Sequence, residues 1–196
     1  MTSDDRRHLE AVPNNDNDTE RQPPHDTAAE QVALGAAIQD RAALDTVTGI
    51  LRSPADLYTP AHQMILAAAQ AVADRGTDLS AITVNAELTK RGETLATGGA
   101  PYLHTLTDSV PTLANAGHYA AIVAEKAALR RLVEGGTRIA QIGYTGRGDI
   151  DDLLDHARRA ADRATEPPTT QDTPMTLADR MPDYVDRLAA GRNQDN

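Results

Sequence analysis

The sequence lacks cysteine, tryptophan and phenylalanine altogether, and it contains five tyrosines. Without cysteine, the chain has no disulfide, no thiolate metal site and no thiol catalysis. A hydrophobic core must therefore be built from Leu, Ile, Val, Ala and Met. The 196 residues suffice for one domain of ordinary size with tails.

Long hydrophobic runs are also missing. No stretch approaches the 18 apolar residues of a membrane-spanning helix, and the N-terminus, MTSDDRRHLE, has no apolar signal-peptide core. We therefore expect a cytoplasmic protein with no membrane contact.

Lysine is scarce, and its positions bear on nucleotide binding. A Walker A loop needs Gly directly before Lys, whereas Lys90 follows Thr89 and Lys126 follows Glu125. The loop Gly143–Gly148 resembles a phosphate loop only in composition, because it follows a helical pattern where a dinucleotide site needs a strand. We expect no cofactor and no catalytic residue, so the chain is not predicted to be an enzyme.

Metal ligation is not predicted either. The six histidines are scattered without the i,i+4 pairing of a helical metal site, so each is interpreted as structural or solvated. Asp149, Asp151, Asp152 and Asp155 are close in sequence, but helix capping explains the first three and the spacing of a calcium loop is absent.

The formal net charge is −10, and acidity extends along the whole chain. Residues 1–24 carry six acids against three bases, and residues 165–196 carry the same numbers. A surface of this sign repels phosphate, which predicts no direct tight binding to nucleic acid.

The apolar pattern predicts an all-α fold, because period-2 alternation nowhere persists over the length of a strand. Residues 1–24 are predicted to be a disordered tail, and residues 25–165 one domain. Five short helices are expected to form a compact bundle. The positions that define them are, in order, Val32, Leu34, Ala37, Ile38; Leu44, Val47, Leu51; Met64, Ile65, Ala68, Ala69, Val72; Leu79, Ile82, Val84, Leu88; and Pro101, Tyr102, Leu103, Leu106, Val110. Thr27 and Glu30 have the spacing of a capping box for the first helix.

Residues 115–165 are predicted to form a protruding αα-hairpin. Its first arm, from about 115 to 143, would be roughly 40 Å long at 1.5 Å per residue, longer than a small domain is wide. Asp149 suits the N-cap of the second arm. Gly135 and Gly136 interrupt the first arm at about 1 kcal/mol each relative to Ala, a cost most easily explained by a close helix or a bend.

The hairpin carries more apolar surface than two antiparallel helices can hide from each other. We therefore expect it to pair with a second copy of the chain, giving a homodimer or a higher oligomer. The residues predicted to form this oligomer interface are Ile122, Leu129, Leu132, Val133, Ile139, Leu153 and Leu154.

Beyond the hairpin, residues 166–175 are predicted to be a Pro-rich linker, residues 176–190 a short amphipathic helix and residues 191–196 a polar tail. The helix cannot bury its apolar face alone, and Pro182 lies within its pattern. The residues predicted to dock this helix on another surface are Leu177, Met181, Tyr184, Val185 and Leu188.

The order of several motifs resembles the N-terminal domain of the DnaB-type replicative DNA helicase. The motifs are Pro23-Pro24-His25-Asp26, Ala29-Glu30-Gln31-Val32-Ala33-Leu34-Gly35, Asp56-Leu57-Tyr58-Thr59-Pro60-Ala61-His62, Gly98-Gly99-Ala100-Pro101-Tyr102-Leu103, Val110-Pro111-Thr112, Asn115, and Tyr119 to Lys126 followed by Arg130-Arg131. Together they cover residues 23 to about 165.

The resemblance implies a helical collar domain of a hexameric helicase, whose hairpins pair and whose surface binds primase and a helicase loader. It also implies that ATP hydrolysis belongs to a separate RecA-like domain, and that residues 175–190 correspond to the family's linker helix. The sequence ends where that ATPase domain is expected, has Leu57 where Phe is common, and places Pro182 in the linker helix.

Three functions follow for testing. The first is a non-catalytic assembly and partner-binding domain of a replicative helicase in the primosome. The second is a stand-alone accessory protein that regulates a full-length helicase through mixed hairpin pairs. The third, from another class, is a helical DNA-binding regulator, which would need a basic recognition helix.

Overall fold

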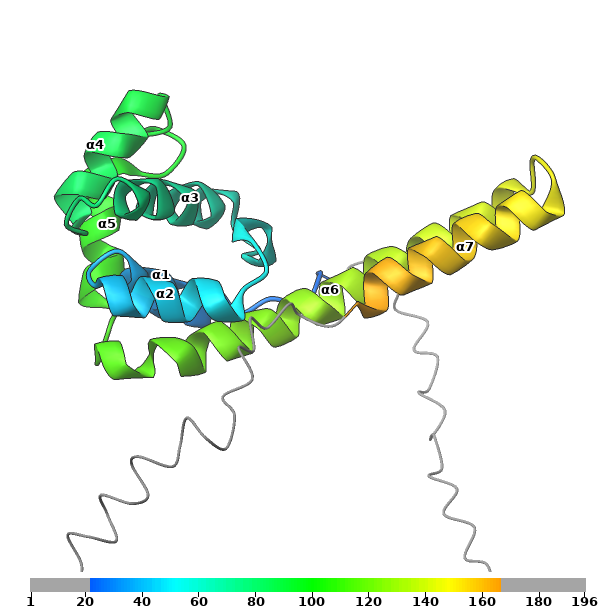
Figure 1. The fold of residues 1–196 in the computed structure, drawn as a ribbon, viewed down its shortest axis with the longest axis horizontal. Coiled ribbons are helices and arrows are strands. Elements are labelled where there is room, and N and C mark those ends of the chain that lie inside the picture. The colour runs from blue at the N-terminus through cyan, green and yellow to red at the C-terminus, as the bar shows by residue number, and fades with distance from the viewer. Residues whose placement is uncertain (1–21, 167–196) are drawn as a thin grey trace, which may run out of the picture.

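Every regular element between residues 22 and 166, the part of the chain that the computed structural model describes, is a helix (Figure 1). The α-helices are α1 (Thr27–Ala37), α2 (Arg41–Ile50), α3 (Pro60–Asp74), α4 (Ala81–Arg91), α5 (Gly99–Asp108), α6 (Ala116–Thr145) and α7 (Ile150–Thr165). Two 3₁₀ turns, η1 (Pro54–Asp56) and η2 (Leu113–Asn115), lie between them. The predicted all-α bundle with a protruding hairpin is confirmed.

Local capping sets the helix boundaries. The side chains of Asp26 and Asp40 accept hydrogen bonds from Ala29 N and Ala43 N at the starts of α1 and α2. Ser80 and Thr83 form a reciprocal capping box on α4. The capping box expected at Thr27 is therefore wrong, because Asp26 caps α1 and the Glu30 side chain bonds elsewhere.

The core of the body lies around α1, which contacts α2, α3, α5 and α6. Leu34, Ile38, Leu66 and Leu103 are at most 1% exposed there. Gly35 permits the close approach of α5, because a Cβ at this position would lie 2.1 Å from Leu106 O. The prediction that Ile82 belongs to the apolar face of α4 is wrong, since Ile82 is exposed.

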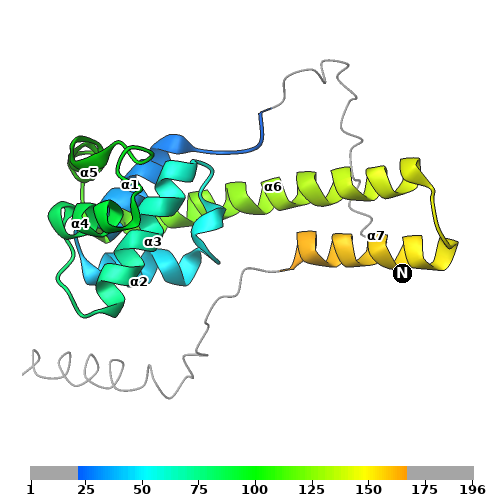
Figure 2. The ribbon, with the colours of Figure 1, turned by 90° about the horizontal axis from the view of Figure 1, so that it is seen from above.

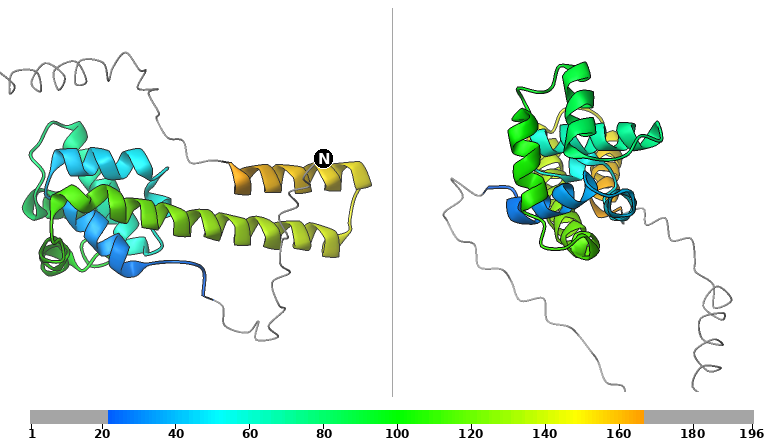
Figure 3. Two further views of the ribbon diagram at one scale, coloured as in Figure 1. Left: turned by 90° about the horizontal axis from the view of Figure 1, so that it is seen from below. Right: turned by 90° about the vertical axis from the view of Figure 1, so that its left-hand side faces the viewer.

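Helix α6 has two different environments along its length. Its first half packs on α1 and α2, where Ala116, Ala120, Val123 and Ala127 are buried (Figure 3, left). Its second half leaves the body and runs alongside α7 (Figures 1 and 2). At 1.5 Å per residue its 30 residues span about 45 Å, so the length of α6 is what carries the hairpin beyond the body.

The hairpin closes through Gly146, which ends α6 in the left-handed conformation, and Asp149, which caps α7 by accepting from Asp151 N at 2.9 Å. Among residues 22–166 no helix has the length and apolar character needed to cross a membrane. The predicted tail up to residue 21, and the predicted linker and amphipathic helix from residue 167 onward, lie outside the described residues.

Candidate interaction surface

A buried polar chain joins three elements of the body. Glu30 on α1 and His62 on α3 are both at most 1% exposed, and Glu30 Oε2 lies 2.8 Å from His62 Nδ1. His62 Nε2 lies 2.7 Å from the hydroxyl of Tyr102 on α5, which also accepts from Gln31 Nε2. Because a carboxylate only accepts, Nδ1 of His62 carries the proton in this contact. The role of His62 is structural.

The Glu30 carboxylate also accepts from the main-chain N–H groups of Tyr58 and Thr59, where α3 begins. Burial raises the pKa of Glu30, but the hydrogen bonds from His62, Tyr58 and Thr59 stabilise the charged form more strongly. The pKa of Glu30 is therefore below its ordinary value of 4.5. An ionised Glu30 thus ties α1 to the start of α3.

The root of the hairpin is held to the body by Arg130, which is 9% exposed. Its Nη1 donates to Pro24 O at 2.8 Å, and its Nη2 donates to Asp56 O. The guanidinium lies 5.7 Å from the centre of the Tyr58 ring, which stacks on His25. This one side chain fixes α6 against both the segment before α1 and η1.

The neighbouring Arg131 adds a second attachment. Its Nη1 donates to Asp56 Oδ1 at 2.6 Å, while Asp56 Oδ2 accepts from Arg52 N. The Arg52 side chain in turn pairs with Glu166, just after α7, at 3.3 Å. Both arms of the hairpin are thus attached to the loop between α2 and α3.

Gly135 sets the separation of the two arms. A Cβ at this position would lie 2.5 Å from the Ala164 Cβ and 3.4 Å from Ala160 O, whereas a Cβ at Gly136 would meet nothing within 4 Å. The expectation that another helix approaches the glycine pair is confirmed for Gly135. Gly136 faces open space.

The residues predicted to form the oligomer interface fall into two groups. Leu129, Leu132, Val133, Ile139 and Leu154 are all exposed, and Leu132, Val133 and Leu154 are about half exposed at 48, 54 and 47%. Ile122 packs against the core of the body and Leu153 is half-buried. These five exposed residues are called the apolar face below.

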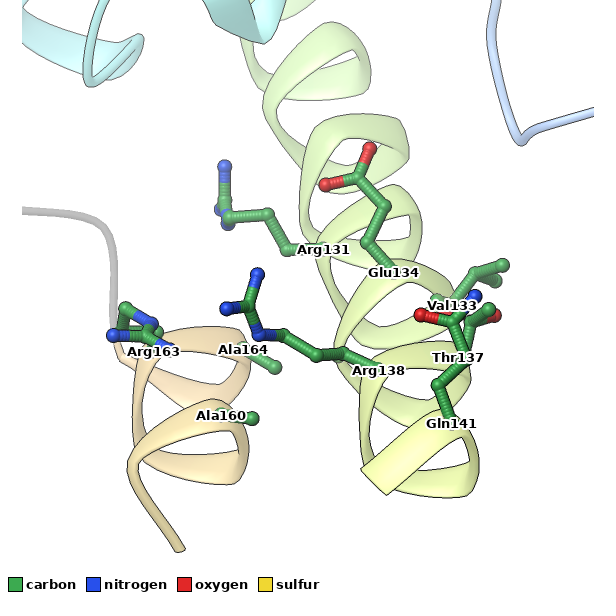
Figure 4. Close-up of a pocket in the computed structure, with 10 residues that line it drawn as sticks. Arg131, Val133, Glu134, Thr137, Arg138, Gln141, Ala160, Arg163 and Ala164 are labelled. Atoms are coloured by element: carbon green, nitrogen blue, oxygen red, sulfur yellow. The ribbon is translucent and has the colours of Figure 1, made fainter. Parts of the chain in front are cut away.

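A second surface lies in the groove between α6 and α7 and is lined by arginines (Figure 4). Arg131 and Arg138 project from α6 toward the side of α7, and Arg163 lines the same hollow from α7. Sequence reasoning missed this cluster. The signal in the sequence was the i,i+7 spacing of Arg131 and Arg138 on α6 and the i,i+4 spacing of Arg159 and Arg163 on α7. These two pairs come together only when the two helices pack side by side.

The residues predicted to dock a linker helix, Leu177, Met181, Tyr184, Val185 and Leu188, lie outside the described residues. Between residues 22 and 166, no group of three or more His, Asp or Glu side chains is placed to hold a metal ion.

Comparison with known proteins gives consistent matches. The family described as DnaB-like helicase N terminal domain matches residues 22–125. The replicative DNA helicase DnaB of Leifsonia xyli subsp. xyli is 44% identical over 92% of this chain and 39% of its own length. The replicative DNA helicase DnaB of Mycobacterium leprae is 50% identical over 79% of this chain and 26% of its own length. This chain therefore spans well under half of these relatives.

A solved structure agrees with the sequence matches. The crystal structure of the N-terminal domain of DnaB helicase from Mycobacterium tuberculosis is similar to this chain, with a TM-score of 0.69 and 50% sequence identity. The similarity covers 71% of this chain and 97% of that one.

Proposed function

Because the chain belongs to the DnaB-like helicase N-terminal domain family, we propose that it is a non-catalytic assembly and partner-binding domain of a replicative DNA helicase. In this role it self-associates through the hairpin and presents a docking surface for other replication proteins. The proposal is supported by relatives that are replicative helicases and by a matching helicase N-terminal domain.

The observation that carries the proposal is the apolar face on a projecting hairpin. Leu129, Leu132, Val133, Ile139 and Leu154 are exposed on a part of the molecule that the body does not cover. Apolar surface gathered on one element typically marks an interface between proteins. Because Arg130 and Arg131 fix the root of α6, the hairpin presents this face in one orientation.

A second copy of the chain is the occupant that this face suits best. Identical apolar faces can cover each other in a two-fold arrangement, and two-fold dimers are the commonest homo-oligomers. We infer that such pairs are the units from which a larger ring is assembled. The partners expected on the remaining surface are primase, a helicase loader or the full-length helicase.

We further propose that residues 1–196 carry no ATPase activity. The two lysines follow Thr89 and Glu125, so neither can supply the Gly-Lys step that holds nucleotide phosphates. The relatives extend well beyond the region they share with this chain, and the proposal places the chemistry in that additional length.

The test is a capture experiment with the immobilised chain and the primase, loader and full-length helicase of the same cell. We expect at least one of the three to be retained, while a DNA oligonucleotide binds no more tightly than the roughly 10⁻⁴ to 10⁻⁶ M of non-specific contacts. ATP hydrolysis in the same sample should stay at background. Retention of none of the three proteins, together with tight and strongly salt-dependent DNA binding, would favour a DNA-binding regulator instead.

A further inference from the structure

The arginines of the hairpin form a positive cluster in a chain whose net charge is −10. Arg138 on α6 and Arg159 and Arg163 on α7 are exposed, and none of them has a hydrogen bond or ion pair within residues 22–166. Elsewhere in this region, arginines such as Arg75, Arg91 and Arg131 are paired with carboxylates. The three hairpin arginines are therefore available to an anionic ligand.

These arginines surround two adjoining hollows between α6 and α7 that share Arg138 and Arg163. The larger has a volume of about 670 Å³ and contains a single acidic residue, Glu134 (Figure 4). The smaller, of about 360 Å³, adds Arg159 and His156 and contains no acidic residue. Together they form an elongated, positively charged channel, called the arginine groove below.

Arg131, at the body end of the arginine groove, has an unused donor. Its Nη1 is paired with Asp56, but its Nε is buried and has no hydrogen-bond partner among the described residues. A buried donor without an acceptor costs free energy.

The chain itself contains a short acidic segment before the described residues. Residues 10–20 hold four acidic residues and no Lys or Arg. The described chain begins at residue 22, and Arg130 Nη1 holds Pro24 O at 2.8 Å, directly at the root of the hairpin. Pro24, four residues after this segment, is thus fixed at the root of the hairpin and tethers the segment there.

The tether is long enough to reach the whole groove. The eight residues between Asp16 and Pro24 can span up to about 28 Å when extended, whereas Arg130 and Arg138 are separated by about 12 Å along α6. A short covalent tether also raises the effective concentration of the segment to roughly the millimolar range. Weak individual ion pairs can therefore add up to occupancy.

We propose that the arginine groove is a binding site for acidic peptide and that residues 10–20 of the same chain occupy it. Asp16, Asp18 and Glu20 supply carboxylates to Arg138, Arg159 and Arg163. The inference does not depend on the proposed helicase role.

The test uses the full chain, whose lack of cysteine allows one to be introduced cleanly. A nitroxide attached to Asn17→Cys broadens the amide signals of nearby residues in a ¹⁵N NMR spectrum. We expect broadening of groove residues Thr137, Gln141 and Ala160 at 0.1 M salt and its loss at 1 M, where the Debye length falls from about 10 Å to about 3 Å. An absence of broadening at these residues at low salt would overturn the proposal.

Charge reversal separates the arginine groove from general attraction to the hairpin. Arg138→Glu with Arg163→Glu should abolish the broadening, and adding Asp16→Lys with Asp18→Lys should restore it. The matched control, Arg147→Glu with Arg158→Glu, makes the same charge change on hairpin residues that do not line either hollow, and should leave the broadening intact. Broadening that survives reversal of Arg138 and Arg163 would contradict the proposal.

Two further measurements identify other occupants. Mixing ¹⁵N-labelled chain without nitroxide and unlabelled chain with nitroxide should give no groove broadening, and broadening only in this mixture would replace the same chain by a second copy. A DNA oligonucleotide should not shift the groove signals at 0.1 M salt. Shifts there, without broadening from the nitroxide, would assign the groove to nucleic acid and overturn the proposal.

Discussion

Glu30 is the most deeply buried acidic side chain among residues 22–166, at 1% exposure. It lies within a sequence motif that resembles the helicase domain, and the structure shows what it does there. Its carboxylate accepts hydrogen bonds from His62 and from the main-chain N–H groups of Tyr58 and Thr59. The same residue therefore connects α1 with α3 and with the loop before α3. A buried charge that is satisfied in this way is costly to alter.

This arrangement predicts a specific pH dependence of stability. Because the pKa of Glu30 is lower in the folded chain than its ordinary value of 4.5, the unfolded chain binds more protons as the pH falls through this region. The stabilisation is fully present above pH 4.5 and is lost as the pH falls through the lower, folded value. Urea unfolding of the chain and of Glu30→Gln at several pH values measures it.

At neutral pH we expect Glu30→Gln to lower the free energy of unfolding by roughly 1.5–3 kcal/mol, the range for hydrogen bonds to charged groups. The difference between the two proteins should shrink as the pH is lowered below 4.5. Glu125→Gln, at an exposed position on α6, is the control and should change little. A Glu30→Gln difference that stays constant down to acid pH would contradict the account.

The residue scale is also where sequence reasoning was least successful. The spacing of Thr27 and Glu30 favoured a capping box. In the structure the Glu30 carboxylate binds His62 on another helix, and Asp26 caps α1 instead. The hydrogen bond from Arg130 to the main-chain carbonyl of Asp56 joins residues 74 positions apart. Neither contact can be inferred from spacing along one helix, because each depends on how separate helices pack.

At the scale of elements, the glycine pair in α6 gives a sharp prediction. Gly135→Ala forces a Cβ to within 2.5 Å of the Ala164 Cβ, so α7 must shift away from α6. We expect a loss of roughly 1–3 kcal/mol, as for other overpacked contacts, and faster amide hydrogen exchange along α7.

Gly136→Ala is the matched control, because nothing lies within 4 Å of the added methyl group. It should stabilise α6 by up to about 1 kcal/mol through helix propensity. Both variants are compared at protein concentrations that keep the chain monomeric. Equal effects of the two substitutions on exchange in α7 would contradict the close approach of the helices at Gly135.

Elements were largely predictable because their signals are local. The apolar period of 3.6 predicted the helices, Asp149 was recognisable as the N-cap of α7, and the length of α6 predicted that it projects from the body. Ile82 was misplaced because the helical pattern of α4 does not say how wide its buried face is. The resemblance to the helicase domain, which rested on motif order, is confirmed by the family match.

At the scale of the whole molecule, the hairpin has two surfaces that meet at Val133. The apolar face carries Leu132 and Leu154, the arginine groove carries Arg138 and Arg163, and Val133 belongs to both. The sequence suggested the first from its excess of apolar residues. It did not suggest the second, because the groove appears only when two antiparallel helices bring their arginines together.

The central claim is that the chain self-associates through the apolar face, and sedimentation equilibrium tests it most directly. Leu132→Asp with Leu154→Asp places two charges on side chains that are about half exposed in the single chain, so the fold should be retained while the dimer is lost. Leu95→Asp is the control, because Leu95 is 98% exposed and lies on the body between α4 and α5. Circular dichroism checks that each variant stays helical.

We expect the unmodified chain and Leu95→Asp to sediment at about 42 kDa, twice the 20.9 kDa of one chain, or at a multiple of that mass. The Leu132→Asp/Leu154→Asp variant should sediment as a helical monomer of 20.9 kDa. An unmodified chain that stays monomeric at tens of micromolar, or a double variant that remains dimeric, would contradict the account.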